Sequence, residues 1–293
     1  MIRLVSFIAT GALAGLALSY LGALHPVGDS LAVFRVALLA GGALAVIWTG
    51  WGAWLRWPIA AICCGLIVWH LVQRSDFREP LPGGGDVTLY QQNLWRFAQG
   101  FSDVYDHLQA MNPDIITLQE VSHQHRPLFS ALAEDYESAL FCPVTWIGEA
   151  IISRFPKVPG SDRCSAPDGF AAMQVVTPKG PVWIVSVHLH WPWPRNQAEQ
   201  VTQLLPQLAE LEGPVIMAGD FNAVAWSYTL RRMADAAGVR RVGGHLHSFG
   251  EMPVPMHLGI DHVLVTKGEG RLQQMPRFAS DHFGLWAELA LPD

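Results

Sequence analysis

The stretch Val215-Ile-Met-Ala-Gly-Asp-Phe-Asn222 decides the fold, because it is a short apolar run that ends abruptly in an acid and an amide. Such a run, bounded by turn-forming residues, is typical of a buried strand. The same arrangement recurs in Asp114-Ile-Ile-Thr-Leu-Gln-Glu120-Val and in Val182-Trp-Ile-Val-Ser-Val-His188-Leu-His190. Packing alone does not require polar side chains at the ends of several strands, so we expect these side chains to share a site.

Further apolar runs continue the strand pattern on both sides of these three. They cover residues 87–94, 150–153, 170–177, 260–265 and 283–291. Helical spacing of apolar residues separates some of the strands, over residues 101–111 and 201–211, with Pro206 as a flaw in the second stretch. Strands with interspersed helices over residues 86–293 predict one α/β domain, and the hairpin-like middle favours a mixed or antiparallel sheet.

The composition is an average of two unlike parts. The chain has 293 residues, of which 51% are hydrophobic and 15% charged, whereas roughly 25% charged is usual for a soluble domain. Residues 1–75 carry four arginines and one acid, a net charge of +3, and the remainder carries 15 basic and 24 acidic residues, a net charge of −9. The domain is acidic, and its only adjacent basic pairs are Arg231-Arg232 and Arg240-Arg241, so its charge argues against a protein that grips bare nucleic acid.

Residues 1–75 are predicted to be a membrane anchor. Uncharged runs cover residues 4–24 and 36–55, and a shorter one, with Pro58 and His70 inside it, covers residues 57–72. Three transmembrane helices therefore precede a Pro- and Gly-rich linker at 76–85 and the α/β domain at 86–293. A cleavable signal peptide is the alternative for the first run, since Arg3 precedes it and Ala23 lies near a small-residue cleavage site. A secreted soluble protein would, however, lack the two runs that follow.

The arginines do not decide on which side of the membrane the α/β domain lies. With three spans and the N-terminus inside, two arginines lie inside and three outside, which slightly disfavours that arrangement. Cys142 and Cys164 flank an apolar stretch at residues 148–153, so a bridge between neighbouring segments is feasible, and two unrelated buried thiols are the alternative. A disulfide would place the domain in an oxidising compartment.

The polar residues at the strand ends form one chemical set. Taken singly, each has an ordinary explanation: a solvated glutamate, a turn, or a structural histidine. Together they supply carboxylates, amides and imidazoles on one side of a sheet, and oxygen ligands without a Cys or His cage suit Mg²⁺ or Mn²⁺ better than zinc. The set comprises Asn93, Glu120, His188, Asp220, Asn222, Asp261, Asp281 and His282.

Six motifs that contain these residues resemble the endonuclease/exonuclease/phosphatase superfamily, which has the deoxyribonuclease I-like fold. In chain order they are Gln92-Asn93, Leu118-Gln119-Glu120-Val121, His188-Leu189, Gly219-Asp220-Phe221-Asn222, Ile260-Asp261-His262 and Ser280-Asp281-His282. The resemblance covers about residues 86–291 and implies a four-layer α/β/β/α sandwich with two mixed central sheets. Within the superfamily the chain is similar to membrane-anchored bacterial members of the teicoplanin-resistance type, which implies an integral protein of the bacterial inner or plasma membrane with its catalytic domain outside the cytoplasm.

The resemblance also implies a role for each site residue. Glu120 would be the principal ligand of a Mg²⁺ or Mn²⁺ ion, with Asn93 and Asp281 close to it. Asp220 would orient or deprotonate the attacking water, and Asn222 would hydrogen-bond the phosphate or the nucleophile. His282, oriented by Asp261, would stabilise charge on the phosphoryl group or act as a base, and His188 would be a second imidazole facing the phosphate.

Two features depart from the family pattern or extend it. His262 stands where the family often has an aromatic residue, and we interpret it as a structural residue of a strand. The loop that holds His190, Trp191 and Trp193 directly follows His188. If exposed, this loop would suit an apolar tail or stack a base; the alternative is that the indoles are buried under the next helix.

Three functions follow from these observations. The first is a membrane-anchored, divalent-metal-dependent phosphoesterase that acts on a phosphorylated, lipid-linked substrate. The second is a metal-dependent endo- or exonuclease, which the acidic domain disfavours. The third is a non-catalytic membrane scaffold that binds phosphorylated head groups, and the complete set of metal and acid/base residues speaks against it.

Overall fold

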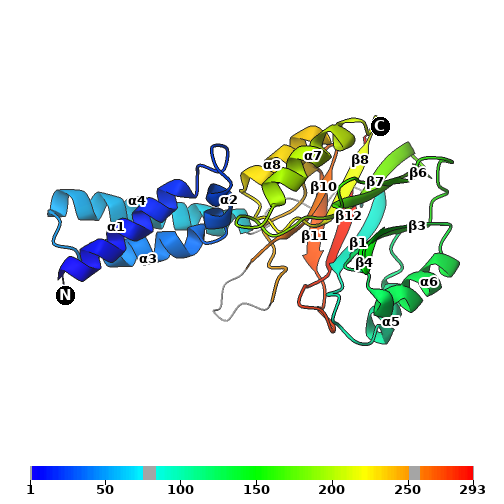
Figure 1. Cartoon of the computed structure of the whole chain (residues 1–293), viewed down its shortest axis with the longest axis horizontal. Helices are drawn as coiled ribbons and strands as arrows, with labels where there is room; N and C mark the ends of the chain where they lie inside the picture. The colour runs from blue at the N-terminus through cyan, green and yellow to red at the C-terminus, as the bar shows by residue number, and fades with distance from the viewer. Residues whose placement is uncertain (1, 75–83, 251–257, 293) are drawn as a thin grey trace.

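A bundle of apolar helices precedes the α/β domain in the chain and projects from one end of it (Figure 1). The computed structural model describes residues 2–74, 84–250 and 258–292. The bundle consists of α1 (Ile2–Leu18), α2 (Val27–Ala32), α3 (Arg35–Ile47) and α4 (Ala53–Arg74). Helices α1 and α4 both pack against α3, around Leu16, Leu39, Ala43 and Cys63.

The helix bounds differ from the three predicted spans. Helix α1 has 17 residues and α3 has 13, about 26 and 20 Å at the α-helical rise, because turns take up the ends of both uncharged runs. Helix α4, predicted as the shortest, has 22 residues, because Arg56 and Pro58 lie inside the helix near its start. Within the described residues, α4 is the one helix whose length and composition suffice to cross a membrane, over Ala53–Val72.

Two six-stranded sheets form the centre of the α/β domain. The first has the order β11-β12-β1-β2-β4-β3 and the second the order β5-β6-β7-β8-β10-β9. Both sheets are mixed, as predicted: β1 runs parallel to β2 and β7 parallel to β8, and the other pairs are antiparallel. The strands are β1 (Val87–Asn93), β2 (Ile115–Gln119), β3 (Ser138–Val144), β4 (Ile147–Ser153), β5 (Arg163–Cys164), β6 (Phe170–Thr177), β7 (Gly180–His188), β8 (Val215–Asp220), β9 (Arg240–Arg241), β10 (Asp261–Val265), β11 (Gly270–Gln274) and β12 (Leu285–Leu289).

The alternation of side chains along the strands explains the four layers. Residues such as Leu89, Ile151, Ile184 and Val263 face the other sheet and build the central core. Residues of opposite parity, such as Ile116, pack under the helices. Helices α5 (Ser102–Met111) and α6 (Arg126–Asp135) cover the first sheet, and α7 (Gln197–Ala209) and α8 (Tyr228–Ala236) cover the second. The predicted α/β/β/α sandwich is confirmed.

A disulfide joins the two sheets at one side of the sandwich. Cys142 lies in β3 and Cys164 in β5, and their sulfurs are bonded. These are the terminal strands of the first and second sheets. The bridge that was only feasible from the sequence is therefore present, and it closes one lateral edge of the sandwich.

Helix α2 attaches the bundle to the α/β domain. Asp29 accepts hydrogen bonds from the backbone nitrogens of Tyr228 (2.7 Å) and Thr229 (2.8 Å), so it caps α8 from a distant part of the chain. The Trp226 indole donates to the Ala32 carbonyl (2.9 Å). The predicted linker at 76–85 lies outside the described residues except for Gly84 and Gly85. The described contacts between the two parts include those of α2 and the packing of the His70 ring of α4 against Trp226, with ring centroids 4.6 Å apart.

Candidate active site

The parallel strands of both sheets end at the same edge of the sandwich. Asn93 ends β1 and Glu120 follows β2, while His188 ends β7 and Asp220 ends β8. Asp261 begins β10 directly opposite Asp220 in the antiparallel register. The carboxyl ends of parallel strands are a common place for a site, and here two sheets each contribute one half of it.

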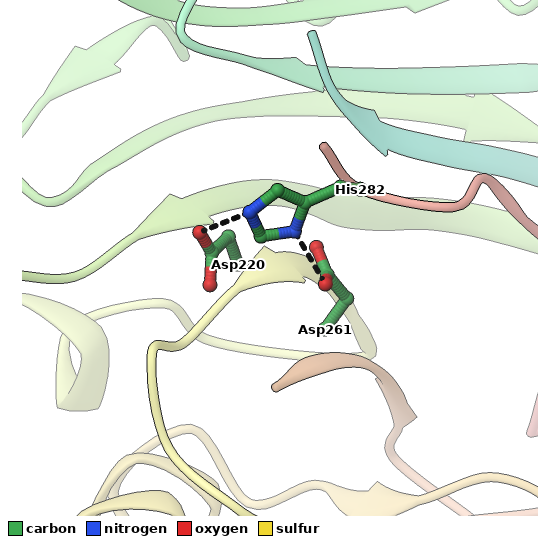
Figure 2. A group of neighbouring side chains, drawn as sticks. All are labelled: Asp220, Asp261 and His282. Atoms are coloured by element: carbon green, nitrogen blue, oxygen red, sulfur yellow. Dashed lines mark hydrogen bonds and ion pairs between the residues drawn. The ribbon is translucent and has the colours of Figure 1, made fainter. Parts of the chain in front are cut away.

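His282 is held between two carboxylates of the second sheet (Figure 2). Its Nδ1 lies 2.8 Å from Asp261 Oδ2, and its Nε2 lies 3.6 Å from Asp220 Oδ2. Asp261 is fixed in turn, because its Oδ1 accepts from Gln91 Nε2 at 3.0 Å. The backbone nitrogen of His282 donates to Ser280 Oγ. The imidazole therefore has one orientation, with Nε2 turned toward Asp220.

These neighbours determine the charge of the pair. Burial alone would lower the pKa of His282, but the charges of Asp261 and Asp220 and the hydrogen bond to Asp261 outweigh it and raise this pKa to about 10. Burial raises the pKa of Asp220 to about 6, and the positive charge of His282 partly offsets that rise. Near neutral pH, His282 is an imidazolium and Asp220 is a carboxylate whose proton affinity is well above the usual.

His188 occupies an equivalent position on the other side of the site. Its Nδ1 lies 3.4 Å from Glu149 Oε1 and its Nε2 lies 3.6 Å from Glu120 Oε1. Burial would lower the pKa of His188, but the hydrogen bond to Glu149 and the charge of Asp220 raise it to about 9. A second imidazolium therefore lies between two carboxylates of the first sheet.

Two site residues have left-handed backbone conformations that side chains other than glycine rarely adopt. The φ angle is 51° at Glu120 and 46° at Asn222. Polar contacts hold both residues: Arg96 N donates to Glu120 Oε2 at 2.9 Å, and Asn222 Nδ2 donates to the Leu189 carbonyl at 2.8 Å. Such outliers at strand ends support a functional site at this edge.

Gly219 explains why the Gly-Asp-Phe-Asn motif begins with glycine. Its φ is +150°, and a Cβ there would lie 2.0 Å from the Val187 carbonyl oxygen of the neighbouring strand. Because that atom belongs to the backbone, a side chain would push β7 and β8 apart. The glycine thereby lets His188 and Asp220 end their strands side by side.

The donor atoms fit a divalent cation. Asp220, Asp261 and His282 have ligand atoms within 4.8 Å of one another. His282 Nδ1 and Asp261 Oδ2, however, are 2.8 Å apart, so these two atoms form a hydrogen bond with each other. Asn222 Oδ1 is buried and has no hydrogen-bond partner among the described residues. Five carboxylates surround two imidazoles at this edge, an excess of negative charge that a hard cation would neutralise: Glu120, Glu149, Asp220, Asp261 and Asp281.

Two of the predicted metal ligands lie next to the Asp220–His282 pair. Asn93 Nδ2 donates to Asp220 Oδ2 at 3.0 Å, and its Oδ1 accepts from Trp95 N at 2.9 Å. Asp281 Oδ1 lies 3.9 Å from His282 Nε2. The structure thus brings Asn93, Asp220, Asp281 and His282 together, and the role of Asn93 and Asp281 as metal ligands stays a prediction.

The predicted aromatic loop lies at the margin of the site. Trp191 and Trp193 are 45% and 48% exposed, so the alternative that both are buried under the next helix is wrong. His190 Nε2 lies 3.2 Å from Asp168 Oδ2. Trp191 contacts the ring of Phe249, which in turn contacts the ring of His282, with centroid separations of 5.7 and 5.0 Å.

His262 has the structural role expected of it. It is buried in β10, its Nε2 lies 2.8 Å from the Ala223 carbonyl oxygen, and its ring packs against Phe221. Sequence reasoning missed two other residues, Glu149 and Phe249. A single carboxylate in the otherwise apolar run of β4 was the available signal for Glu149, and no local signal indicated Phe249.

Comparison with known proteins gives a family and a fold. Residues 90–282 match the model of the endonuclease/exonuclease/phosphatase family. No curated protein sequence matches the chain significantly. Three solved structures with similar folds are a 3′ phosphatase, NExo, from Neisseria bound to product DNA hairpin (18% identity, TM-score 0.56), an AP endonuclease from Archaeoglobus fulgidus (14%, 0.54) and beta toxin from Staphylococcus aureus (14%, 0.51). Each similarity covers 69% of this chain and 98–99% of the other.

Proposed function

Because the chain belongs to the endonuclease/exonuclease/phosphatase family, a family of divalent-metal-dependent hydrolases of phosphate esters, we propose that it is a membrane-anchored phosphoesterase that uses Mg²⁺ or Mn²⁺ and acts on a lipid-linked phosphate. One observation carries the proposal. The imidazoles of His188 and His282 lie at one edge of the sandwich, each between carboxylates that raise its pKa. A dianionic phosphate needs positive charge from the protein, and water needs an acceptor for its proton.

The side chains divide the reaction between them. Water attacks phosphorus in line with the ester oxygen and Asp220 takes the proton of the water. The P–O bond to the alcohol breaks, and the departing alkoxide takes a proton from solvent. A pKa of about 6 makes Asp220 a better base than an ordinary aspartate while leaving it ionised at neutral pH. The raised pKa values of His188 and His282 favour charge stabilisation at the phosphoryl oxygens over general-base catalysis.

The remaining polar residues position the reactants. Asn222, whose Oδ1 is buried without a described partner, would accept a hydrogen bond from the nucleophile, and Asp261 orients His282. Glu120 would hold the metal, with Asn93 and Asp281 near it. A bound Mg²⁺ or Mn²⁺ supplies Lewis-acid neutralisation of phosphoryl charge.

The surface of the helical bundle supports membrane anchoring. A water-soluble bundle would cover most of its large apolar side chains, whereas here many are exposed on α1, α3 and α4. Phe7 is 77% exposed and Trp54 is 80% exposed. Other exposed members are Ile2, Leu4, Ile8, Leu18, Leu44, Leu55, Trp57, Ile62, Val68, Trp69, Leu71 and Val72. These side chains suit a lipid solvent.

The disulfide supports a location of the α/β domain outside the cytoplasm of a bacterial cell, because such bonds persist in oxidising compartments. The distribution of arginines on the two sides of the membrane, which slightly disfavours this placement in the sequence, disfavours it less once the structure is considered. Arg35, counted as an outside charge, is buried, and its guanidinium bonds the side chain and carbonyl of Ser19. Because Arg35 has a structural role, it no longer counts as a topology signal, and two arginines remain on each side of the membrane.

The test is a substrate panel on the purified full chain in detergent. With Mg²⁺ present, we expect hydrolysis of polyprenyl or phospholipid phosphates to exceed hydrolysis of single-stranded and duplex DNA. Glu120→Gln and His282→Ala should each lower the rate by about 100-fold or more.

Asp114→Asn is the matched control, because Asp114 accepts hydrogen bonds from Thr88 N and Oγ1 at the opposite edge of the sheet. Faster cleavage of DNA would replace the proposal with a nuclease. Failure to hydrolyse any phosphate ester, with no heat of Mg²⁺ binding by calorimetry, would replace it with a head-group-binding scaffold.

A further inference from the structure

The described part of the α/β domain exposes few large apolar side chains, and most of them lie around the site. Five are exposed: Phe97, Trp146, Val176, Trp191 and Trp193. Four are aromatic, with exposed fractions of 59% for Phe97, 75% for Trp146, 45% for Trp191 and 48% for Trp193. We call these four the aromatic rim. Val176, near the end of β6 remote from the site, is the exception.

The first pair of the aromatic rim lies beside Glu120. Phe97 follows Arg96, whose backbone nitrogen donates to Glu120 Oε2. Trp146 occupies the turn between β3 and β4, and this turn is tied to the segment after Glu120 because Val121 N donates to the Gly148 carbonyl. Between Phe97 and Trp146 lies a hollow of about 250 Å³, and its wall also includes Ile147 and the polar residues Arg96, Ser122, His123 and Gln124. A hollow whose surface is mainly apolar therefore adjoins the proposed metal ligand.

The second pair lies on the other side of the site, beside His282. Trp191 reaches this histidine through Phe249, as the ring contacts show. The Trp193 carbonyl accepts a hydrogen bond from Ser30 Oγ of α2 at 2.6 Å. The four rings thus flank the site on two sides, and the backbone of Trp193 is hydrogen-bonded to α2.

The edge of the sandwich that holds the site lies at the end of the α/β domain to which the helical bundle attaches. Helix α2 contacts residues that follow β8, including Trp226 and Tyr228, and packs with Phe249 and Ile260 around Ala32. Figure 1 shows the other bundle helices extending away from the domain beyond α2. A bilayer around the bundle would face this edge.

We propose that the aromatic rim is a membrane-binding surface, which enters the head-group layer and lets the site take a phosphate ester of a hydrophobic alcohol directly from the bilayer. This inference rests on the proposed membrane anchoring and narrows the substrate class of the same site. Trp and Phe favour the membrane interface, where the ring is partly removed from water and the indole N–H keeps a polar partner. The hollow beside Glu120 would hold the apolar group next to the phosphate.

The position of the aromatic rim can be measured without any substrate. Spin labels are attached at Phe97→Cys, Trp146→Cys and Trp193→Cys, each made in the full chain with the exposed Cys64 changed to serine. The proteins are reconstituted in discs of phosphatidylcholine and phosphatidylglycerol. We expect oxygen to relax these labels more than a water-soluble nickel chelate does, and the reverse for the control Val176→Cys. Rim labels with the same accessibilities as the control would overturn the proposal.

A kinetic test asks whether the aromatic rim serves lipid substrates. The rate on a phospholipid phosphate in vesicles is divided by the rate on a short-chain, water-soluble phosphate ester. The double variant Phe97→Ser/Trp146→Ser should lower this ratio about tenfold or more, because the protein loses the free energy of transferring two aromatic rings from water into the membrane. The control Val176→Ser should leave the ratio within about twofold.

The outcomes separate this proposal from the proposed function. If Glu120→Gln abolishes metal-dependent hydrolysis but the ratio does not respond to the rim variants, the enzyme stands and the membrane-binding surface is wrong. If no ester is hydrolysed, the spin-label measurement still decides the position of the aromatic rim. Selective loss of cleavage of single-stranded DNA in the rim variants would assign the rings to base stacking and would also overturn the proposal.

Discussion

Asp261→Asn tests whether His282 acts as a cation. Asp261 accepts from His282 Nδ1 at 2.8 Å through Oδ2 and from Gln91 Nε2 at 3.0 Å through Oδ1. The amide keeps the size of the side chain, and its carbonyl oxygen can still accept from Gln91. Its NH₂ group would then face His282 Nδ1, which can only accept from it, so the neutral tautomer with hydrogen on Nε2 is favoured.

The size of the effect follows from the bond that is lost. A hydrogen bond to a charged group contributes about 1.5–3 kcal/mol, and each 1.36 kcal/mol in the activation free energy is a factor of ten in rate. Asp261 is also the charge that contributes most to the raised pKa of His282. If the imidazolium stabilises the phosphoryl group in the transition state, kcat should fall roughly 10- to 150-fold.

The assay is steady-state hydrolysis by the purified full chain with saturating Mg²⁺, with kcat and KM measured separately. We expect the loss to be mainly in kcat, because the charge matters most where negative charge develops. Asp114→Asn is the control, since it also neutralises a partly buried, doubly hydrogen-bonded aspartate; it should lower stability and leave kcat unchanged. A kcat for Asp261→Asn within twofold of the unmodified protein, with an unchanged melting midpoint, would refute the cationic role of His282.

Three further changes probe the framework. Removing the disulfide with Cys142→Ser/Cys164→Ser opens a loop of 22 residues, and denaturant unfolding should show a loss of about 3 kcal/mol in the free energy of unfolding. Burial lowers the pKa of His262 to about 4 in the folded protein. In the unfolded chain this histidine has a pKa of about 6.5, so between about pH 6.5 and 4 the unfolded state binds one more proton than the folded state. Stability should therefore fall as the pH drops from about 6.5 to 4, by about 3 kcal/mol more than in His262→Gln, as measured by melts at several pH values. Asp29→Asn leaves one of the backbone nitrogens at the start of α8 without its acceptor and should cost about 1–2 kcal/mol, measured as a lower melting midpoint.

The strands that form the site could be predicted because their signal is local. An apolar run that ends in Glu120, His188 or Asp220 places the polar side chain at a strand end whatever the rest of the chain does. Strands β3 and β11 had no such signal, because both alternate buried and exposed positions weakly and pair at or near the margin of a sheet. The lengths of α1, α3 and α4 were also beyond local reasoning, since an uncharged run contains turns as readily as helix.

Contacts between distant segments explain what the sequence did not reveal about the site. Glu149 meets His188 only because β4 pairs with β2 in the first sheet and the first sheet packs on β7 of the second. Phe249 reaches His282 through a bridge between their backbones. The two residues of each contact are far apart in the sequence, so periodicity and spacing could not pair them. The family motifs named His188 and His282 but not these partners.

The division of the site between two sheets makes the packing of the sandwich part of its chemistry. The first sheet supplies Glu120 and Glu149, and the second supplies His188 and Asp220, so a slip of one sheet over the other would separate each imidazole from its carboxylate. A buried polar network lies across the interface directly beneath the site: Gln91 Nε2 donates to Gln119 Oε1 and to Asp261 Oδ1, and Gln119 Nε2 donates to Ser186 Oγ.

Apolar side chains alone would tolerate several alignments of the two sheets, because their packing is not directional. Amide groups that lose water on burial are stable only where donors and acceptors meet, so one alignment is favoured over its neighbours. Gln91 and Gln119 are buried polar residues in a mainly apolar core, and they select the register in which Asp261 can hold His282. The same bond from Gln91 that aligns the sheets also fixes the Asp261 carboxylate that contacts His282. This links the stability of the sandwich to the orientation of its proposed catalytic groups.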